Sequence, residues 1–345
     1  MRIPTLKIKN KKILLDSKNE IERIREHSDI LAICATPTGY SWLGVKLATI
    51  SLFGDFTFQI PQHYSNSILN DKELNELCNH IIKLQFKQII FSGFAPFYIH
   101  IINNISKHTK IKVVYHGFLA ELSENKLQQT AFYELIKLAK EKKIHSIGFV
   151  KKGLALSVNK MFNISTFEII LPNNRIVDFP HANSKEINIG CLLNTTFRKN
   201  IHNQAIAGLM IQNSKIHVFK TDELTYLPQD RIIYHSLMNH DDFLSLLGEM
   251  SVNLHVTFSE SWGQVCAESI SQGVPCITSH TSSFFDYDKN LKKELIVEGF
   301  DDSWYIYKKI EAVLANRERL SKMCIDYAKR LNVLALEKKQ LFLND

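Results

Sequence analysis

Two glutamates with seven residues between them, Glu260 and Glu268, stand where a predicted strand gives way to a predicted helix. The apolar run 254–258 is typical of a short strand, and the helical pattern that follows continues to Gln272, before Gly273 ends it. Glu260 lies in the polar loop before this helix, and the Glu268 side chain leans back toward the helix N-terminus. Because a helix N-terminus attracts anions, the stretch predicts an anion site flanked by two carboxylates.

The start of this helix has two further sequence features. Ser261, followed three positions later by Gln264, resembles a capping box, in which two side chains satisfy the first free N–H groups of a helix. Trp262, Cys266 and Ile270 fall at helical spacing. We therefore expect a capped helix whose apolar stripe is buried.

The same residues resemble a family signature. The run Glu260-Ser261-Trp262-Gly263, followed by Glu268 and then by Gly273-Val274-Pro275, resembles the E-x-F-G-x-x-x-x-E…G-x-P (E-x7-E) signature of retaining nucleotide-sugar glycosyltransferases of family 4. Trp262 stands where the family usually has phenylalanine. The resemblance implies an α/β GT-B fold, with two Rossmann-like domains facing each other across a cleft. It also implies a hexosyltransferase-type enzyme that moves a sugar from a nucleoside-diphosphate sugar to an acceptor.

The pattern along the whole chain agrees with two such domains. Strand-like runs alternate with helical patterns of ten or more residues, which predicts βαβ units and parallel sheets. We expect an acceptor-side domain over 1–172, a linker over 173–186, a donor-nucleotide domain over 187–330 and a helical tail over 331–345. Residues 1–16, with Asn10 at the turn, are expected to form a short hairpin.

Composition bounds the function further. The chain has 345 residues and is 45% hydrophobic, so it is long enough to form two domains, each with its own core. Its net charge of +7 is well below that of a typical DNA-binding protein. This charge fits an anionic substrate or an anionic membrane face, and equally an AT-rich genome that favours Lys, Asn and Ile. The six cysteines form no C-x-x-C pair, which indicates a reducing compartment. Without a secretory or membrane-spanning pattern, we expect a soluble cytoplasmic protein, free or held peripherally at the inner membrane face.

The resemblance implies how the donor diphosphate is held. The helix opening at Trp262, Gly263 and Gln264 offers backbone N–H groups to the phosphates, and glycine permits close approach. Gly39, which follows the first strand-like run, resembles a reduced form of the family's glycine-rich loop.

Cationic help is expected from the segment 189–200. Lys199-Asn200 matches the K-N of the family's G-R…K-N pattern, but Cys191 stands where an arginine should follow Gly190. Arg198 is the candidate to supply the second positive charge from a neighbouring position. The alternative is that both basic residues are solvated in the first turn of a helix, but there they would oppose the helix dipole.

For the nucleoside and the sugar, the resemblance assigns separate residues. Glu268 is expected to accept hydrogen bonds from the ribose hydroxyls, and the loop around His235 and Leu237 to contact the base. Glu260 is the catalytic candidate that faces the hexose, either to stabilise the cationic transition state or to hold a sugar hydroxyl, with Ser261 sharing the sugar hydroxyls. An isolated glutamate is more often an exposed surface residue, but the spacing of this pair favours the functional interpretation.

In the first domain, His116 follows a predicted strand, at the edge of a parallel sheet where ligands bind. In similar glycosyltransferases a histidine there reaches the donor sugar or its phosphate, so we include His116 among the catalytic candidates. The alternative is a histidine satisfied within the core or on the surface.

No metal or cofactor is expected, because the histidines form no H-x-x-x-H pattern. The expected partners are a nucleotide sugar and a glycan, lipid-linked or protein acceptor, in the setting of polysaccharide biosynthesis. Two alternatives stay open: a catalytically silent GT-B partner subunit, which Cys191 favours, and a glycosyltransferase that acts on nucleic acid.

Overall fold

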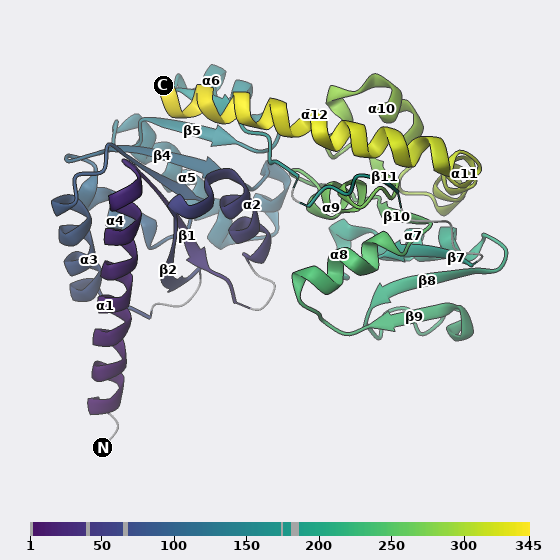
Figure 1. Ribbon diagram of the computed structural model, residues 1–345, viewed down its shortest axis with the longest axis horizontal. Helices are drawn as coiled ribbons and strands as arrows, with labels where there is room; N and C mark the ends of the chain where they lie inside the picture. The colour runs from purple at the N-terminus through teal and green to yellow at the C-terminus, as the bar shows by residue number, and fades with distance from the viewer. Residues whose placement is uncertain (1–2, 39–41, 65–67, 174, 181–185) are drawn as a thin grey trace. The chain divides into compact units, whose positions relative to one another are not determined.

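The computed structural model describes residues 3–38, 42–64, 68–173, 175–180 and 186–345, with side chains from residue 10 onward. The chain divides into two compact units (Figure 1). Unit 1 comprises residues 1–172 and 335–345, and unit 2 comprises residues 173–334. Among the described residues, no helix is long and apolar enough to cross a membrane.

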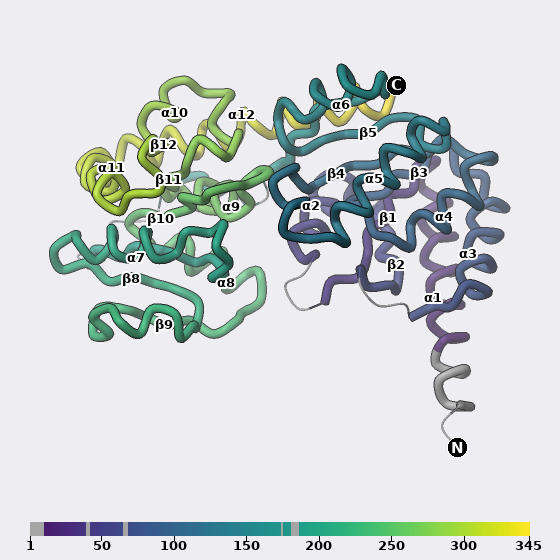
Figure 2. The backbone as a smooth tube through the Cα atoms, turned by 180° about the vertical axis from the view of Figure 1, so that it is seen from behind, coloured from purple at the N-terminus to yellow at the C-terminus, as the bar shows by residue number. Residues whose placement is uncertain are grey.

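Unit 1 is built on a six-stranded parallel sheet in the order β2-β1-β3-β4-β5-β6. Its strands are β1 (Ile30–Thr36), β2 (Thr57–His63), β3 (Gln88–Ser92), β4 (Lys110–Tyr115), β5 (Ser146–Phe149) and β6 (Thr166–Glu168). Its helices are α1 (Ile3–His27), α2 (Leu43–Phe53), α3 (Asp71–Lys83), α4 (Tyr98–Ile105), α5 (Lys126–Lys140) and α6 (Leu154–Phe162). Helices α1, α3 and α4 lie side by side along the sheet, as the view from behind in Figure 2 also shows.

The first helix corrects one expectation. Residues 3–27 form the continuous helix α1, not a hairpin that turns at Asn10. The alternation of lysine and isoleucine near the N-terminus has a strand-like period, but the burial of Leu14, Ser17, Ile21 and Ile24 follows steps of three and four residues. This longer helical period determines the structure, because its apolar stripe packs into the core of unit 1.

Unit 2 has its own six-stranded parallel sheet, in the order β12-β11-β10-β7-β8-β9. Its strands are β7 (Ile187–Cys191), β8 (Ser214–Phe219), β9 (Ile232–His235), β10 (Val252–His255), β11 (Cys276–Ser279) and β12 (Ile296–Val297). Its helices are α7 (Ile201–Leu209), α8 (His240–Gly248), α9 (Gln264–Ser271), α10 (Lys289–Leu295), α11 (Ser303–Ala315) and α12 (Arg317–Asn344). The end of α12, from residue 335 onward, belongs to unit 1.

The segment predicted as a linker begins with residues that hydrogen-bond within unit 2. The Val177 N–H donates to the Ser271 carbonyl at 2.9 Å, and the Gln272 side-chain amide donates to the Arg175 carbonyl at 3.1 Å. Residues 181–185 of this segment lie outside the described part of the chain.

Candidate active site

Glu260 and Lys199 form a buried ion pair at the edge of the unit 2 sheet. The Lys199 Nζ lies 2.5 Å from the Glu260 Oε2, and the two side chains are only 11% and 10% exposed. Arg198 Nη1 lies 3.3 Å from the same oxygen, and His255 Nε2 lies 3.4 Å from it. The structure therefore brings together Arg198, Lys199 and Glu260, as the sequence-based roles require, and adds His255.

The charge state of this cluster follows from its surroundings. Burial alone would raise the pKa of Glu260, but the Lys199 ammonium, assisted by His255 and Arg198, holds that pKa well below its usual range. Burial lowers the pKa of His255, against the hydrogen bond to Glu260 that raises it. Near neutral pH the Glu260 carboxyl is therefore ionised and the His255 ring is neutral.

The local backbone explains why Lys199 reaches this position. Phe197–Lys199 form a single 3₁₀ turn after β7, and Asn200 then adopts a left-handed conformation (φ 54°) before α7 begins. Asparagine tolerates this conformation better than most residues. Lys199 therefore lies in the turn that precedes α7 and not in its first helical turn.

Gln204 fixes this turn to the end of β10. Its side-chain amide nitrogen donates to the Lys199 carbonyl at 2.7 Å, and its oxygen accepts from the Val256 N–H at 2.8 Å. The residue is fully buried within α7. The sequence carried a signal that Gln204 is buried, since it lies three residues after the buried Ile201 and four residues before the buried Gly208 on one face of α7.

We expect the substitution Gln204→Leu to lower the free energy of unfolding by about 2–4 kcal/mol, because it leaves one buried carbonyl and one buried N–H unsatisfied. Urea denaturation measures this change. The matched control is Gln229→Leu, at an exposed glutamine in the 3₁₀ turn before β9 that also donates to backbone carbonyls, where we expect a smaller loss. Equal losses in the two variants would contradict the positioning role of Gln204.

The helix that follows Glu260 begins differently from the prediction. Its N-cap is Gly263, in a left-handed conformation (φ 98°), and no side chain caps it. The expected Ser261–Gln264 capping box is wrong, because Gln264 is already the first helical residue and its amide donates to Glu268 instead. An added Cβ at Gly263 would lie 3.2 Å from Ser282 Oγ and 3.3 Å from His255 Cε1. Glycine therefore suits this position both because the backbone is left-handed and because a side chain would be crowded.

The residues on either side of this N-cap are held by different contacts. The Ser261 N–H donates to the Glu260 Oε1 at 3.1 Å, which fixes the carboxylate against the loop. The Trp262 side chain is buried edge-on against Phe284, with ring centroids 5.1 Å apart. Since no described side chain caps α9, its first N–H groups are placed to bind an anion.

Glu268 lies one turn further along α9 and is also buried. Its Oε1 accepts hydrogen bonds from His240 Nε2 at 2.8 Å and from Gln264 Nε2 at 3.1 Å. Among the described residues, no hydrogen bond reaches its second oxygen, Oε2. His240, the first residue of α8, had no sequence signal, because its pairing with Glu268 spans 28 positions of the chain.

The predicted base-contacting residues lie at the end of β9. Leu237 is 63% exposed, and His235 stacks on His217 with ring centroids 5.1 Å apart. The two rings also approach within 2.9 Å, between His217 Nδ1 and His235 Nε2. This contact engages one ring nitrogen of His235 inside unit 2.

The His217–His235 stack predicts a pH dependence of stability. Burial, and then the neighbouring His235 and Lys215, lower the pKa of His217 to about 4. An unfolded histidine titrates near pH 6.5, so between about 6.5 and 4 only the unfolded chain binds this proton. The stability contributed by neutral His217 is therefore complete above that window and is lost as the pH falls through it.

We expect His217→Gln to flatten the decline of the unfolding free energy between pH 6.5 and 4, by at most about 1.4 kcal/mol per pH unit. Urea denaturation at a series of pH values measures the slope. His202→Gln, at an exposed histidine of the same unit, is the control and should leave the slope unchanged. An unchanged slope in His217→Gln would show that His217 does not titrate in this window.

In unit 1, His116 follows β4 as predicted. Its Nε2 lies 2.9 Å from the hydroxyl of Ser92, which ends β3, and that hydroxyl lies 2.6 Å from the Thr49 hydroxyl. Burial lowers the pKa of His116 to about 4, so the ring is neutral near pH 7 and suited to hydrogen bonding. Gly39, the remaining predicted residue, lies outside the described residues.

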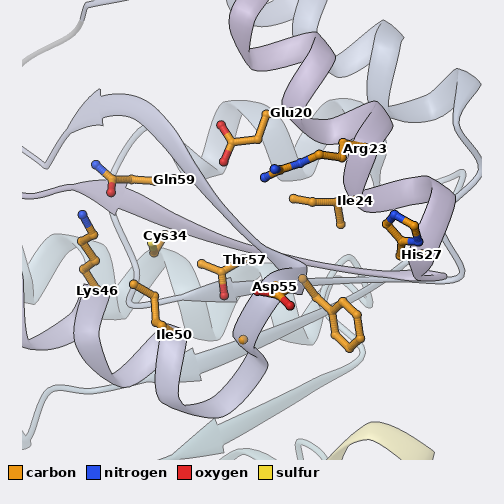
Figure 3. A pocket seen from close by; sticks show the side chains of 12 residues that line it. Glu20, Arg23, Ile24, His27, Cys34, Lys46, Ile50, Asp55, Thr57 and Gln59 are labelled. Carbon is orange, nitrogen blue, oxygen red and sulfur yellow. The ribbon is translucent and has the colours of Figure 1, made fainter.

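Unit 1 also contains a cavity of about 620 Å³ between α1, α2 and the edge strand β2 (Figure 3). Its lining includes Glu20, Arg23, His27, Lys46 and Asp55, and none of these forms a salt bridge with another described residue. Burial raises the pKa of Glu20, against the opposing effect of Arg23. The cavity is therefore a polar recess with both signs of charge, and none of the sequence-predicted residues lines it.

One segment of unit 2 is similar to a known family of domains. Residues 200–331 match the model of the family described as glycosyl transferases group 1. A search of the curated proteins finds no match. The matched segment contains Glu260, Glu268 and the whole of α9.

Solved structures share the fold at low sequence identity. Sucrose-phosphate synthase from Thermosynechococcus elongatus superposes with a TM-score of 0.64 at 11% identity, over 91% of this chain and 98% of that one. The α,α-trehalose-phosphate synthase (UDP-forming) from Burkholderia vietnamiensis gives 0.60 at 9%, over 91% and 99%. Anabaena HepE, in complex with UDP and glucose, gives 0.60 at 10%, over 90% and 95%.

These structural neighbours confirm the fold expected from the sequence. Residues 200–331 thus resemble the glycosyl transferases group 1 family, and the chain has the GT-B fold.

Proposed function

We propose that the protein is a retaining, metal-independent glycosyltransferase of the family 4 type, which moves a hexose from a nucleoside-diphosphate sugar to a glycan or lipid-linked acceptor. The observation that carries the proposal is the uncapped N-terminus of α9 beside the buried Arg198–Lys199–Glu260 cluster, with Glu268 further along the same helix. We place this reaction in cytoplasmic polysaccharide biosynthesis.

The diphosphate would lie against the N–H groups of α9 and draw Lys199 and Arg198 toward it. Without a ligand, Glu260 offsets their charge and holds both side chains in position. With the phosphates bound, Glu260 is placed to accept hydrogen bonds from the sugar and to stabilise positive charge at the anomeric carbon. The bond from that carbon to the diphosphate breaks, and the diphosphate keeps the electron pair. The acceptor oxygen bonds to the carbon on the same face and passes its proton to the departing diphosphate oxygen.

Glu268 would hold the ribose. Its Oε1 is fixed by His240 and Gln264, while Oε2 receives no hydrogen bond from a described residue, which suits a ribose hydroxyl as donor. The ligands named for similar structures support a nucleotide-sugar donor: UDP and glucose in HepE, and UDP and GlcNAc in a pneumococcal O-GlcNAc transferase.

The test is a donor-hydrolysis assay with UDP-glucose, UDP-GlcNAc and GDP-mannose. We expect the protein to release free nucleoside diphosphate from one of them, with EDTA present, and proton NMR to show that the released sugar first has the anomeric configuration of the donor. Inversion, or a requirement for added Mg²⁺ or Mn²⁺, would contradict the retaining, metal-independent assignment.

A catalytically silent partner subunit is the second candidate. Cys191, fully buried at the end of β7, stands at the position of the family's arginine, and one similar structure is the GtfA/B complex (TM-score 0.54, 14% identity). A silent subunit would release no nucleotide from any donor, although it stays folded. Release by the wild type and not by Lys199→Met would rule this candidate out.

A further inference from the structure

Four aromatic rings line the carboxyl edge of the unit 2 sheet. Phe197 follows β7, Phe258 follows β10, His280 follows β11 and Phe300 follows β12. These strands are consecutive in the order β12-β11-β10-β7, and ligands of parallel α/β sheets bind at the carboxyl ends of the strands. We call these four residues the aromatic row.

The rings contact one another in sequence. Phe197 stacks on Phe258 with centroids 5.0 Å apart and planes at 29°. Phe258 meets Phe300 at 6.1 Å, and His280 meets Phe300 edge-on at 4.9 Å. The row is therefore a continuous ring surface and not four isolated side chains.

The row adjoins the ion-pair cluster through the backbone. The Phe258 N–H donates to the Arg198 carbonyl at 2.8 Å, and the Asn200 side-chain amide donates to the Phe300 carbonyl at 2.6 Å. Phe197 directly precedes Arg198, and Phe258 lies two residues before Glu260. The rings and the buried charges thus belong to the same loops.

Exposure shows that the row is not part of the core. Phe197 is 79% exposed and His280 is exposed, whereas Phe258 and Phe300 are half-buried. An exposed phenylalanine that presents its ring beside charged groups is typical of a binding surface. A pyranose ring fits such a surface, because its C–H face packs on an aromatic ring while its hydroxyls bond to neighbouring charged side chains.

We infer that the aromatic row binds a pyranose ring of the acceptor glycan, with Phe197 as its exposed stacking face. This inference rests on the proposed function and adds to it that the acceptor is a carbohydrate contacted by unit 2. One end of the row adjoins Arg198 and Glu260, so an acceptor ring there lies beside the proposed donor site, and His280 supplies a polar partner at the other end.

The test is saturation-transfer NMR with trisaccharides of glucose, N-acetylglucosamine, galactose and mannose, added to protein saturated with the nucleoside diphosphate that binds it. We expect one trisaccharide to bind and to receive saturation on its ring C–H protons. Phe197→Ala should weaken that binding about tenfold, and Phe197→Tyr should restore it. Phe179→Ala removes a phenylalanine that is 82% exposed elsewhere in unit 2, and should change nothing.

Several results would overturn the inference. One is that no trisaccharide binds, and another is that Phe197→Ala binds it as well as the wild type does. If sedimentation shows that Phe197→Ala has a different oligomeric mass from the wild type, the row is a protein interface. If Phe197→Ala loses affinity for the nucleotide sugar but not for the nucleoside diphosphate, the row contacts the donor hexose instead. If Phe197→Ala binds the nucleoside diphosphate as tightly as the wild type does, the proposed donor site is intact and only the inference about the acceptor fails.

Discussion

Replacing Lys199 by methionine is expected to reduce sugar transfer by about a hundredfold or more and to lower the free energy of unfolding by about 3–5 kcal/mol. Lys199 is the cation nearest to the buried Glu260 carboxylate, at 2.5 Å, and it lowers the pKa of that carboxyl. Without it a buried negative charge keeps only weaker partners, and a bound diphosphate loses its principal cation. Urea denaturation and the donor-hydrolysis assay measure the two effects.

A double variant separates stability from function. In Lys199→Met/Glu260→Gln both charges are gone, so much of the lost stability should return, while nucleoside diphosphate affinity should stay low. Lys215→Met, at an exposed lysine 3.7 Å from Glu186, is the control and should change neither property by much. Recovery of full affinity in the double variant would mean that Lys199 serves only to neutralise Glu260.

Glu268→Ala is expected to weaken nucleoside diphosphate binding by about 10- to 100-fold, since charge-assisted hydrogen bonds contribute about 1.5–3 kcal/mol each. The structural reason is the fixed carboxylate, held through Oε1 by His240 and Gln264. Calorimetric titration gives the affinity. Glu298→Ala, at an exposed glutamate of the same unit, should bind as the wild type does.

The ribose itself can be varied in the same experiment. If Glu268 holds the ribose hydroxyls, the wild type should bind the nucleoside diphosphate more tightly than its 2′,3′-dideoxy analogue, and Glu268→Ala should bind both equally. Discrimination that persists in Glu268→Ala would transfer the ribose contact to another residue. This comparison also cancels any general loss of stability caused by the substitution.

The sequence was most informative where local patterns and tertiary packing agree. The order of strand, loop and helix around Glu260 and Glu268 was predicted because an apolar run, a polar break and a helix-ending Gly273 follow each other within one stretch. The strand itself is Val252–His255 and not 254–258, because the apolar character of 256–258 continues past the last residue that pairs in the sheet. The start of α1 was predicted wrongly, because alternating lysine and isoleucine have a strand-like period over a few residues only. Ser261 and Gln264 had capping-box spacing, but the left-handed Gly263 starts the helix later than that spacing requires.

The contacts within the site could be predicted only in part. Lys199 and Glu260 were expected near one another because the first was assigned to the donor phosphate and the second to the donor sugar. Their direct ion pair was not predicted, because it spans 61 positions and depends on the pairing of strands β7 and β10. His255 carried a signal, as a polar residue at the end of an apolar strand, where ligands of parallel sheets bind. His240 carried none, because its place beside Glu268 arises from the packing of α8 on α9.

If α9 and the Arg198–Lys199–Glu260 cluster form a nucleoside diphosphate site, a calorimetric titration detects the binding and its dependence on Lys199. UDP, GDP, ADP and CDP are added in turn to the wild type and to Lys199→Met, and the heat of binding is measured. We predict that one of them binds the wild type with a Kd between about 1 µM and 1 mM, and binds Lys199→Met at least about tenfold more weakly. The absence of binding by all four, or equal binding by both proteins, would contradict the claim.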